Sequence, residues 1–406
     1  MEQDIRELLG IKVCSPYWDA AYAQALKDPE QPDWLTEAYL RQLHTQLNML
    51  TDNLEVLIQA LHLLVQEKPL CLFVKTLLHI LELHKPFREC FSEFTMPKAP
   101  ETAGSTLAYD CLGIFPLLAH VPVIRKEMEE RGIDAQTLSQ FFSILDNGVS
   151  ECTAAAGRPF YSQYYFSANW GMIFYTGIPM GRLRFERANR TEYPVRIFVN
   201  DAKETAILMD GVTLHASGHI LGAGGCTDSE GSFAADYTET EDAYEGYPAD
   251  RVTGLVQPKR IRLPKAIWHP VYKPGDGIMK VHIPFKGSLA REVCVRSYDK
   301  ARELFPKCFP EYSSTGFTVN TWMLAPELDQ ILKENSNIRA FQQMYHRFPL
   351  RSSGRDIFEY VFQTPVTDVS QVDIESLPEN SSLQRDVKDM LRKGVVFHEF
   401  GGFIPW

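Results

Sequence analysis

The sequence predicts an α+β protein in two parts: an all-helical N-terminal domain, residues 1–150, and a mixed α/β domain with a largely antiparallel sheet, residues 151–406. Three features of the apolar pattern support this class. Up to about residue 150, apolar residues recur every three or four positions, as on one face of a helix. From about residue 158, short alternating runs between Asn, Asp and Gly turns indicate antiparallel strands. From residue 278, strands and helices alternate, which is typical of an α+β domain.

Helical spacing and capping residues define the elements of the first domain. Leu35–Leu50 and Leu54–Leu64 carry leucines at three- and four-residue intervals. Pro69 suits the first turn of a third helix, because its missing N–H has no helical partner there. Asp134 is a good N-cap for the last helix of the domain, and we expect that helix to end at Gly148, since glycine favours helix C-termini.

The second domain is expected to begin with a meandering antiparallel sheet. Its strands are assigned to the alternating runs Arg182–Arg187, Val195–Val199, Ala206–Met209, Thr213–Leu221 and Arg251–Leu263. The order then becomes strand, helix, strand, helix, strand, helix and strand. These elements are assigned to Ile278–Pro284, Ser288–Phe305, Phe317–Leu324, Asn337–Phe348, Asp356–Phe362, Ser382–Arg392 and Val395–Ile404.

Composition excludes several classes of protein. The net charge of −11 argues against a nucleic-acid partner, because phosphate recognition usually requires a basic excess. The most apolar region, Leu54–Leu83, is interrupted by Glu67, Lys68, Pro69 and Lys75, so we expect no membrane span. The eight cysteines are scattered without a Cys-x-x-Cys pair, which predicts reduced thiols in a cytoplasmic protein. Nothing in the composition indicates an oligomeric state.

The charges of the second domain are unevenly placed. Glu204–Asp250 carries ten acidic residues and no Lys or Arg, whereas Arg251–Glu303 carries twelve basic residues and four acidic ones. The first stretch suits a cationic ligand and the second an anionic one. The alternative is that both are solvated faces of opposite sign.

The stretch that joins the strand at Ile278–Pro284 to the next helix suits an anion. His282 lies on the less apolar strand face and ends the strand. Gly287 permits a positive φ and a close approach of a ligand, and Ser288 is a good N-cap. Lys286 adds positive charge beside the free N–H groups of a helix start. The alternative is an ordinary strand-to-helix connection with a surface histidine.

This order of elements resembles the second half of the GNAT acyl-coenzyme A (acyl-CoA) transferase fold. The segment Asn337–Phe348 is similar to a later helix of that family, with a small residue one turn in and a tyrosine near its end. The whole chain resembles bacterial acyltransferase-domain proteins that join a helical N-terminal domain to a GNAT-like C-terminal domain. The matching stretches are Leu214–Leu221, Val281–Pro284, Ser336–Ile338 and Leu383–Arg385. The chain departs from the usual GNAT turn, which has two glycines and an Arg or Gln, because only Gly287 and Lys286 are present.

The resemblance implies an acyl-CoA co-substrate, either acetyl-CoA or another acyl-CoA. Its pantetheine arm would pair with the strand, and its pyrophosphate would lie on the backbone N–H groups after the turn. The implied cofactor-binding residues are Val281, Ile283, Lys286, Gly287, Ser288 and Leu289.

The resemblance also implies direct transfer of the acyl group to an amine of a small molecule or peptide. His282 would be the general base, because its ordinary pKa suits removal of an amine proton, and Tyr345 would protonate the departing thiolate. His219 and Trp322 are assigned to the acceptor-binding wall. The alternative is that these side chains are packed or surface residues of a non-catalytic GNAT-like ligand-binding or scaffold protein.

Two further hypotheses concern His219. Because four residues of a strand span roughly 13 Å, His215 and His219 cannot grip one ion, and we expect no metal. Cys226 with His219 as its base is a separate hypothesis of nucleophilic catalysis, against which a lone cysteine is usually a small apolar residue.

Overall fold

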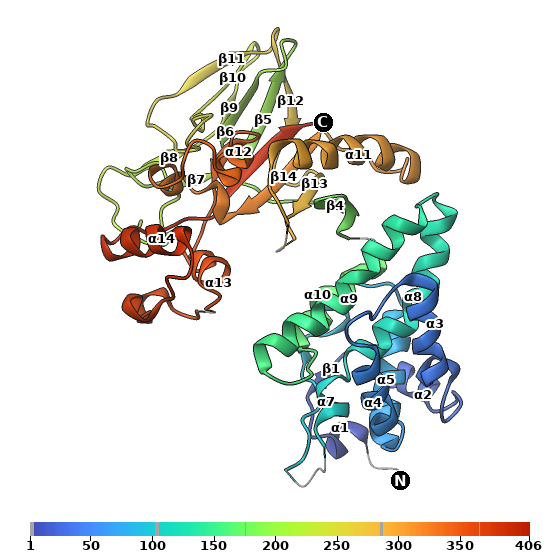
Figure 1. Cartoon of the computed structure of the whole chain (residues 1–406). Coiled ribbons are helices and arrows are strands. Elements are labelled where there is room, and N and C mark those ends of the chain that lie inside the picture. The colour runs from blue at the N-terminus through green and yellow to red at the C-terminus, as the bar shows by residue number, and fades with distance from the viewer. Residues whose placement is uncertain (1–3, 102–104, 175, 285–286, 365) are drawn as a thin grey trace. The chain divides into compact units, whose positions relative to one another are not determined.

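The computed structural model describes residues 4–101, 105–174, 176–284, 287–364 and 366–406. Contacts within the chain divide it into two compact units, Met1–Pro179 and Met180–Trp406. The predicted α+β class is confirmed, with helices in the first unit and a mixed sheet in the second (Figure 1). The division lies later than position 150, which falls inside the long helix α9 (Ala135–Ala156).

The first unit is built mainly of helices. They are α1 (Ile5–Leu8), α2 (Trp18–Ala25), α3 (Glu37–Leu47), α4 (Leu54–Leu64), α5 (Lys68–Leu81), α6 (Phe87–Cys90), α7 (Leu107–Asp110), α8 (Ile114–Glu130), α9 and α10 (Gln163–Asn169), with the 3₁₀ turns η1 (Asp33–Leu35) and η2 (Trp170–Phe174) and the two-residue strands β1 (Val13–Cys14) and β2 (Glu93–Phe94). Among the described residues, no single helix is long and apolar enough to cross a membrane, although the pair α4 and α5, bent by 114°, meets that test by length and composition.

The caps of the first unit confirm part of the sequence analysis. Pro69 lies in the first turn of α5, and the side chain of Asp134 accepts a hydrogen bond from the Thr137 N–H at the start of α9. The prediction that α9 ends at Gly148 was wrong. A Cβ at Gly148 would lie 3.0 Å from the Tyr165 ring, so this glycine allows close packing inside the helix, and Gly157, with φ +67°, ends it.

The second unit is organised by a six-stranded sheet with strand order β15-β16-β14-β13-β4-β3. Its strands are β15 (His346–Pro349), β16 (Phe400–Pro405), β14 (Gly316–Thr321), β13 (Ile278–His282), β4 (Leu183–Ala188) and β3 (Ile178–Met180). β13 and β14 run parallel, whereas β13 with β4, β14 with β16 and β15 with β16 are antiparallel. The sheet is therefore largely antiparallel, as predicted, with one parallel pair at its centre.

A long helix packs on one face of the central sheet and a smaller sheet on the other, and further small sheets complete the described part of the unit. The smaller sheets are formed by β12 (Trp268–Tyr272), β5 (Val195–Asn200) and β6 (Thr205–Met209), by β11 (Ile261–Pro264), β10 (Ala243–Gly246) and β9 (Thr238–Glu239), and by β7 (Val212–Leu214) and β8 (Phe233–Ala235). Helix α11 (Arg291–Cys308) packs on one face, where the Tyr298 ring contacts Phe185 and Phe317. On the other face, Ile278 and Phe403 join the apolar cluster of the β5–β6 sheet.

Several predicted elements of this unit were wrong in type or length. The predicted strand Asp356–Phe362 is helix α13 (Asp356–Val361), because its buried residues Ile357, Phe358 and Val361 follow helical spacing. Helix α12 (Asn337–Gln342) is shorter than predicted, since the residues from His346 pair with β16 as β15. Tyr345 and His346, which were predicted to lie in this helix, therefore lie outside it.

Other assigned strands are shorter than predicted. The run Thr213–Leu221 pairs as a strand only as far as Leu214 and then turns, and Arg251–Leu263 is a loop as far as β11. The predicted strand Phe317–Leu324 ends in the 3₁₀ turn η3 (Trp322–Leu324), which η4 (Pro326–Gln330) follows.

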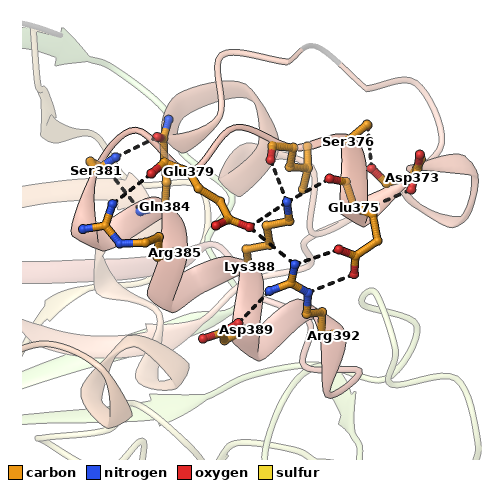
Figure 2. A network of polar contacts seen from close by, with 11 residues as sticks. Asp373, Glu375, Ser376, Glu379, Ser381, Gln384, Arg385, Lys388, Asp389 and Arg392 are labelled. Atoms are coloured by element: carbon orange, nitrogen blue, oxygen red, sulfur yellow. Dashed lines mark hydrogen bonds and ion pairs between the residues drawn. The ribbon is translucent and has the colours of Figure 1, made fainter.

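A helical segment between β15 and β16 is held by its own polar network. It contains α13, the 3₁₀ turns η5 (Val369–Gln371) and η6 (Ile374–Ser376), and α14 (Ser382–Arg392), whose bounds match the prediction. Figure 2 shows Lys388 pointing into this network. Its buried ammonium donates to the carbonyls of Glu375 and Leu377 and contacts the Glu379 carboxylate at 2.9 Å. The network fixes α14 against η6, and α13 then contributes to the site described next.

Candidate active site

The two parallel central strands separate from one another part-way along their length. Among the described residues, the ladder between β13 and β14 holds two register pairs, Met279 with Phe317 and Lys280 with Thr318. Each strand keeps its outer partner further on, since His282 still pairs with Arg184 of β4 and Thr321 with Phe400 of β16. The strands therefore diverge into a wedge, and the backbone of β13 facing it can pair with an extended ligand.

The wedge contains a cavity of about 250 Å³. It is lined by Val281, His282, Ile283, Val319, Asn320, Thr321, Trp322, Met323, Asp356, Tyr360 and Glu399. Two predicted site residues of β13, Val281 and His282, thus lie together with Ile283, which follows the strand, and with the predicted acceptor residue Trp322. The polar residues contributed by α13 and by the chain before β16 could not be placed from the sequence, because α13 was assigned as a strand.

His282 lies at the end of β13, where its ring is hydrogen-bonded to a partly buried carboxylate. Its Nε2 atom lies 2.7 Å from Oε2 of Glu186 on the neighbouring strand β4. The hydrogen bond from His282 lowers the pKa of Glu186, and Lys280, 3.9 Å from the other carboxylate oxygen, favours the same ionised form. A ring that donates Nε2–H to this carboxylate keeps a lone pair on Nδ1, which is the state required of a general base.

Glu399 is a second ionisable group of the cavity that the sequence analysis did not identify. Burial raises the pKa of its carboxyl to about 7, and the nearby Asp356 adds to the shift. Burial also raises the pKa of Asp356. A carboxyl that titrates near neutral pH inside a cavity is able to accept or release a proton at working pH.

Tyr345 lies away from the lining of the wedge. Its ring is fully buried directly after α12, and its hydroxyl is hydrogen-bonded to the hydroxyl of Tyr298 on α11. Burial and the neighbouring Tyr298 raise its pKa well above the ordinary value. The structure therefore keeps the Tyr345 hydroxyl protonated and does not place it beside His282.

The turn after β13 differs from the predicted phosphate site. Gly287 has φ +111°, as expected, but α11 begins at Arg291 with Ala290 as its N-cap, so the prediction that Ser288 caps the helix was wrong. The Ser288 hydroxyl instead accepts a hydrogen bond from the Ala290 N–H, and the Ser288 carbonyl accepts one from Arg182. The predicted residue Leu289 is half-buried in this turn, and Lys286 lies outside the described residues.

A basic cavity lies at the end of this turn. It has a volume of about 260 Å³ and is lined by Arg251, Arg291, Val295, Tyr298, Arg302, Gln343, Met344 and Ile404. The two cavities are close along the chain, because Ile283 lines the wedge and Arg291 lines the basic cavity. The three arginines were not identified individually, although the basic excess of Arg251–Glu303 was the signal that contained them.

His219 is not among the residues that line the wedge. Its ring is buried, and its Nε2 atom lies 3.0 Å from Oε1 of Glu327 in η4. The structure therefore does not support its assignment to the acceptor wall. Cys226 lies 3.8 Å from the Ser217 hydroxyl and from Nε2 of His398, and burial raises the pKa of its thiol, which disfavours the thiolate of a nucleophilic cysteine.

Comparisons with known proteins agree with this geometry. The family model of the GNAT-like C-terminal domain matches residues 178–404. The chain is similar to a mutant acyltransferase solved in complex with octanoyl-CoA, with 18% identity, a TM-score of 0.61, and 99% of this chain and 98% of that chain covered. The same identity, TM-score and coverage hold for an acyltransferase solved in complex with decanoyl-CoA and teicoplanin. No curated protein matches the sequence. At such low identity, the likeness to the solved structures establishes a shared fold.

Proposed function

The chain belongs to the family of proteins with a GNAT-like C-terminal domain, and from that premise we propose that it is an acyl-CoA-dependent N-acyltransferase. The observation that carries the proposal is the separation of β13 from β14, each still bonded to its outer neighbour, around a polar cavity. An extended pantetheine arm fits such a gap as an added strand, bonded to backbone groups near Val281 and Ile283.

The basic cavity supports an anionic end for the same ligand. The phosphates of acyl-CoA would contact Arg251, Arg291 and Arg302, whose planar guanidinium groups suit phosphate oxygens. In this proposal the three arginines, and not a helix start capped by Ser288, supply most of the positive charge around the phosphates. The amides of Gly287, Ser288 and Leu289 remain on the route between the two cavities.

The proposed reaction is direct attack of an amine on the thioester carbonyl. Nδ1 of His282 takes the proton that the amine loses, while Glu186 holds the ring and stabilises the imidazolium that forms. The C–N bond forms, the C–S bond breaks, and the thiolate takes a proton. The imidazolium of His282 is the proposed donor of that proton, because the Tyr345 hydroxyl is buried against Tyr298 outside the lining of the wedge and its raised pKa makes it a weak acid. Glu399 is the alternative base, because its pKa of about 7 also suits this step.

The acceptor is proposed to be an amine of a small molecule or peptide. The similar structures were solved with octanoyl-CoA, with decanoyl-CoA, and with teicoplanin, a glycopeptide. A medium acyl chain and a glycopeptide amine are therefore included among the first substrates to test, beside acetyl-CoA.

Turnover of acyl-CoA tests the proposal directly. The full chain is incubated with acetyl-, octanoyl- or decanoyl-CoA and a panel of amines, and acylated product is measured by mass spectrometry, because the eight cysteines would react with thiol dyes. The proposal expects product and free CoA in equal amounts. Saturable CoA binding without turnover on any amine would favour a non-catalytic ligand-binding protein, and no binding at all would remove both interpretations.

A further inference from the structure

Behind the wedge, three segments far apart in sequence bring two histidines and a glutamate together. His219 follows β7, Glu327 lies in η4, and His398 lies two residues before β16. Their nearest ligand-type atoms all lie within 4.8 Å of one another. The two rings are 4.1 Å apart between centroids, and both side chains are at least nine-tenths buried. No role in the proposed acyl transfer uses this cluster.

Both rings converge on a single carboxylate oxygen. Oε1 of Glu327 lies 3.0 Å from Nε2 of His219 and 2.8 Å from Nδ1 of His398. Oε2 of the same carboxylate is buried and has no hydrogen-bond partner among the described residues. If this cluster served only to satisfy hydrogen bonds, we would expect the two rings to contact different oxygens of Glu327, because a buried carboxylate oxygen without a partner costs free energy.

The outer nitrogens of both rings are already occupied. Nε2 of His398 lies 2.7 Å from the carbonyl oxygen of Gly224, which only accepts, so this nitrogen carries a hydrogen. In the neutral ring, Nδ1 is then a lone pair facing another acceptor, Oε1 of Glu327. Nδ1 of His219 lies 2.9 Å from the Ser217 hydroxyl. Rings held from outside by a carbonyl or hydroxyl, with their inner nitrogens converging, are the usual arrangement of metal-bound histidines.

From these contacts we propose that His219, Glu327 and His398 bind a divalent transition-metal ion of the zinc class. Two imidazoles and a carboxylate are a ligand set that zinc accepts, and three protein ligands leave one position for water or for Oε2. Tetrahedral zinc requires ligand atoms roughly 3.3 Å apart, so the contacts of 3.0 Å and 2.8 Å from the two rings to Oε1 of Glu327 would lengthen by a few tenths of an ångström around the ion. Cys226 lies on the outer side of His398 and is not a ligand in this arrangement.

The position of the site indicates a bracing role. Glu399 directly follows His398 and lines the wedge, and Trp322 and Met323, which also line it, lie in η3 just before η4. None of the three ligands lines the wedge itself. The ion would therefore fix one wall of the cavity by joining the β7 loop, η4 and the start of β16.

Metal content measured on the full, untagged chain tests the proposal. We expect inductively coupled plasma mass spectrometry to find about one zinc-class ion per chain, and the chelated protein to regain one equivalent of Zn²⁺ with a higher melting temperature. Cobalt uptake should give the visible absorption of a low-symmetry site. If chelation changes neither metal content nor melting temperature, and added Zn²⁺ does not bind, the cluster is a protonated His–Glu–His network and the proposal fails.

Variants separate the ligands from their surroundings. The double variant His219→Ala/His398→Ala should abolish binding of Zn²⁺. The control variant His269→Ala should leave binding unchanged, because His269 is an exposed residue of β12 that pairs with Asp201. Ser217→Ala keeps all three ligands and should weaken the affinity for Zn²⁺ about tenfold, because it removes an orienting contact. Equal affinity in Ser217→Ala and in the double variant would contradict the assignment. None of these measurements depends on acyl transfer.

Discussion

At the scale of single residues, the account depends on the contact between His282 and Glu186. The two side chains extend from neighbouring strands onto the same face of the sheet, and the ring remains half exposed at the cavity. Glu186 is less exposed than His282, which is consistent with an orienting carboxylate behind a reacting base. The sequence predicted the histidine, because it ends a strand before a turn, but a partner 96 residues away in sequence required the strand register.

His282→Ala should lower kcat by about a hundredfold or more at pH 7 and leave KM for acyl-CoA nearly unchanged, because a general base acts on the amine and not on CoA binding. Glu186→Gln should reduce kcat less and shift the acidic limb of the pH–rate profile. Steady-state kinetics measure both, with His269→Ala as a surface control. An unchanged kcat in His282→Ala would transfer the role of base to Glu399.

Glu399→Gln should change how stability depends on pH. The folded pKa of about 7 lies above the ordinary value of 4.5, so the wild type loses stability as pH rises between these two values, where the unfolded chain ionises first. The variant has a glutamine at position 399, which does not ionise, so it does not lose stability in this way. Its free energy of unfolding relative to wild type should therefore increase by about 2–3 kcal/mol between pH 4.5 and pH 7.5. Denaturation curves at several pH values measure the difference, and a pH-independent difference would contradict the raised pKa.

At the scale of elements, the parallel pair at the centre of the sheet creates the site. Antiparallel neighbours on both sides hold β13 and β14 by separate ladders, so the two strands diverge without losing their outer hydrogen bonds. The apolar and β-branched residues of these segments predicted β13 and most of β14 correctly, and both faces of the two strands are largely buried. The separation of β13 from β14 cannot be predicted from the local sequence, since it depends on which strands lie beside each other in the sheet.

The helical segment between β15 and β16 shows where local patterns mislead. Asp356–Phe362 is rich in aromatic and β-branched residues, which favour strands, but tertiary contacts select a helix that buries Ile357 and Phe358 in an apolar cluster with Trp322. By contrast, α14 was predicted with correct bounds, because Ser381 and Gln384 form a capping box that fixes its start.

Lys388→Met should destabilise this segment by about 2–4 kcal/mol, because it leaves the buried carbonyls of Glu375 and Leu377 without their donor. Arg392→Met is the matched comparison, since Arg392 is 38% exposed and its ion pairs with Glu375 are screened by water. We expect about 1 kcal/mol or less for that change. Urea unfolding measures both, and equal losses for the two variants would show that burial does not govern this network (Figure 2).

At the scale of the whole molecule, the proposed co-substrate is an anion although the protein itself is acidic. The chain carries a net charge of −11, and ten acidic residues lie in Glu204–Asp250. The basic cavity supplies the local exception, because Arg251, Arg291 and Arg302 surround one hollow at α11. Composition alone predicted the sign of the charge on each stretch. It could not predict the cavity, which forms because α11 and the residues after α12 lie together.

Arg251→Glu with Arg291→Glu should lower the affinity for CoA at least about tenfold at low salt and leave the affinity for pantetheine, which has no phosphate, unchanged. Wild-type affinity for CoA should fall with rising ionic strength. Calorimetric titration compares the two ligands, with Arg190→Glu as a control at an exposed arginine paired with Glu192. An equal loss for pantetheine would mean that the change disrupts the fold and not a phosphate site.

The wedge between β13 and β14 is tested most directly by hydrogen–deuterium exchange of the full chain with and without decanoyl-CoA. The account predicts new protection of backbone amides in Val281–Ile283 and Val319–Thr321, with weaker protection around Gly287–Arg291. Ile283→Trp, which fills the cavity mouth, should remove this protection, whereas Ile267→Trp, at an exposed isoleucine between β11 and β12, should not. Saturating ligand that leaves both strands exchanging at their original rates would contradict the account.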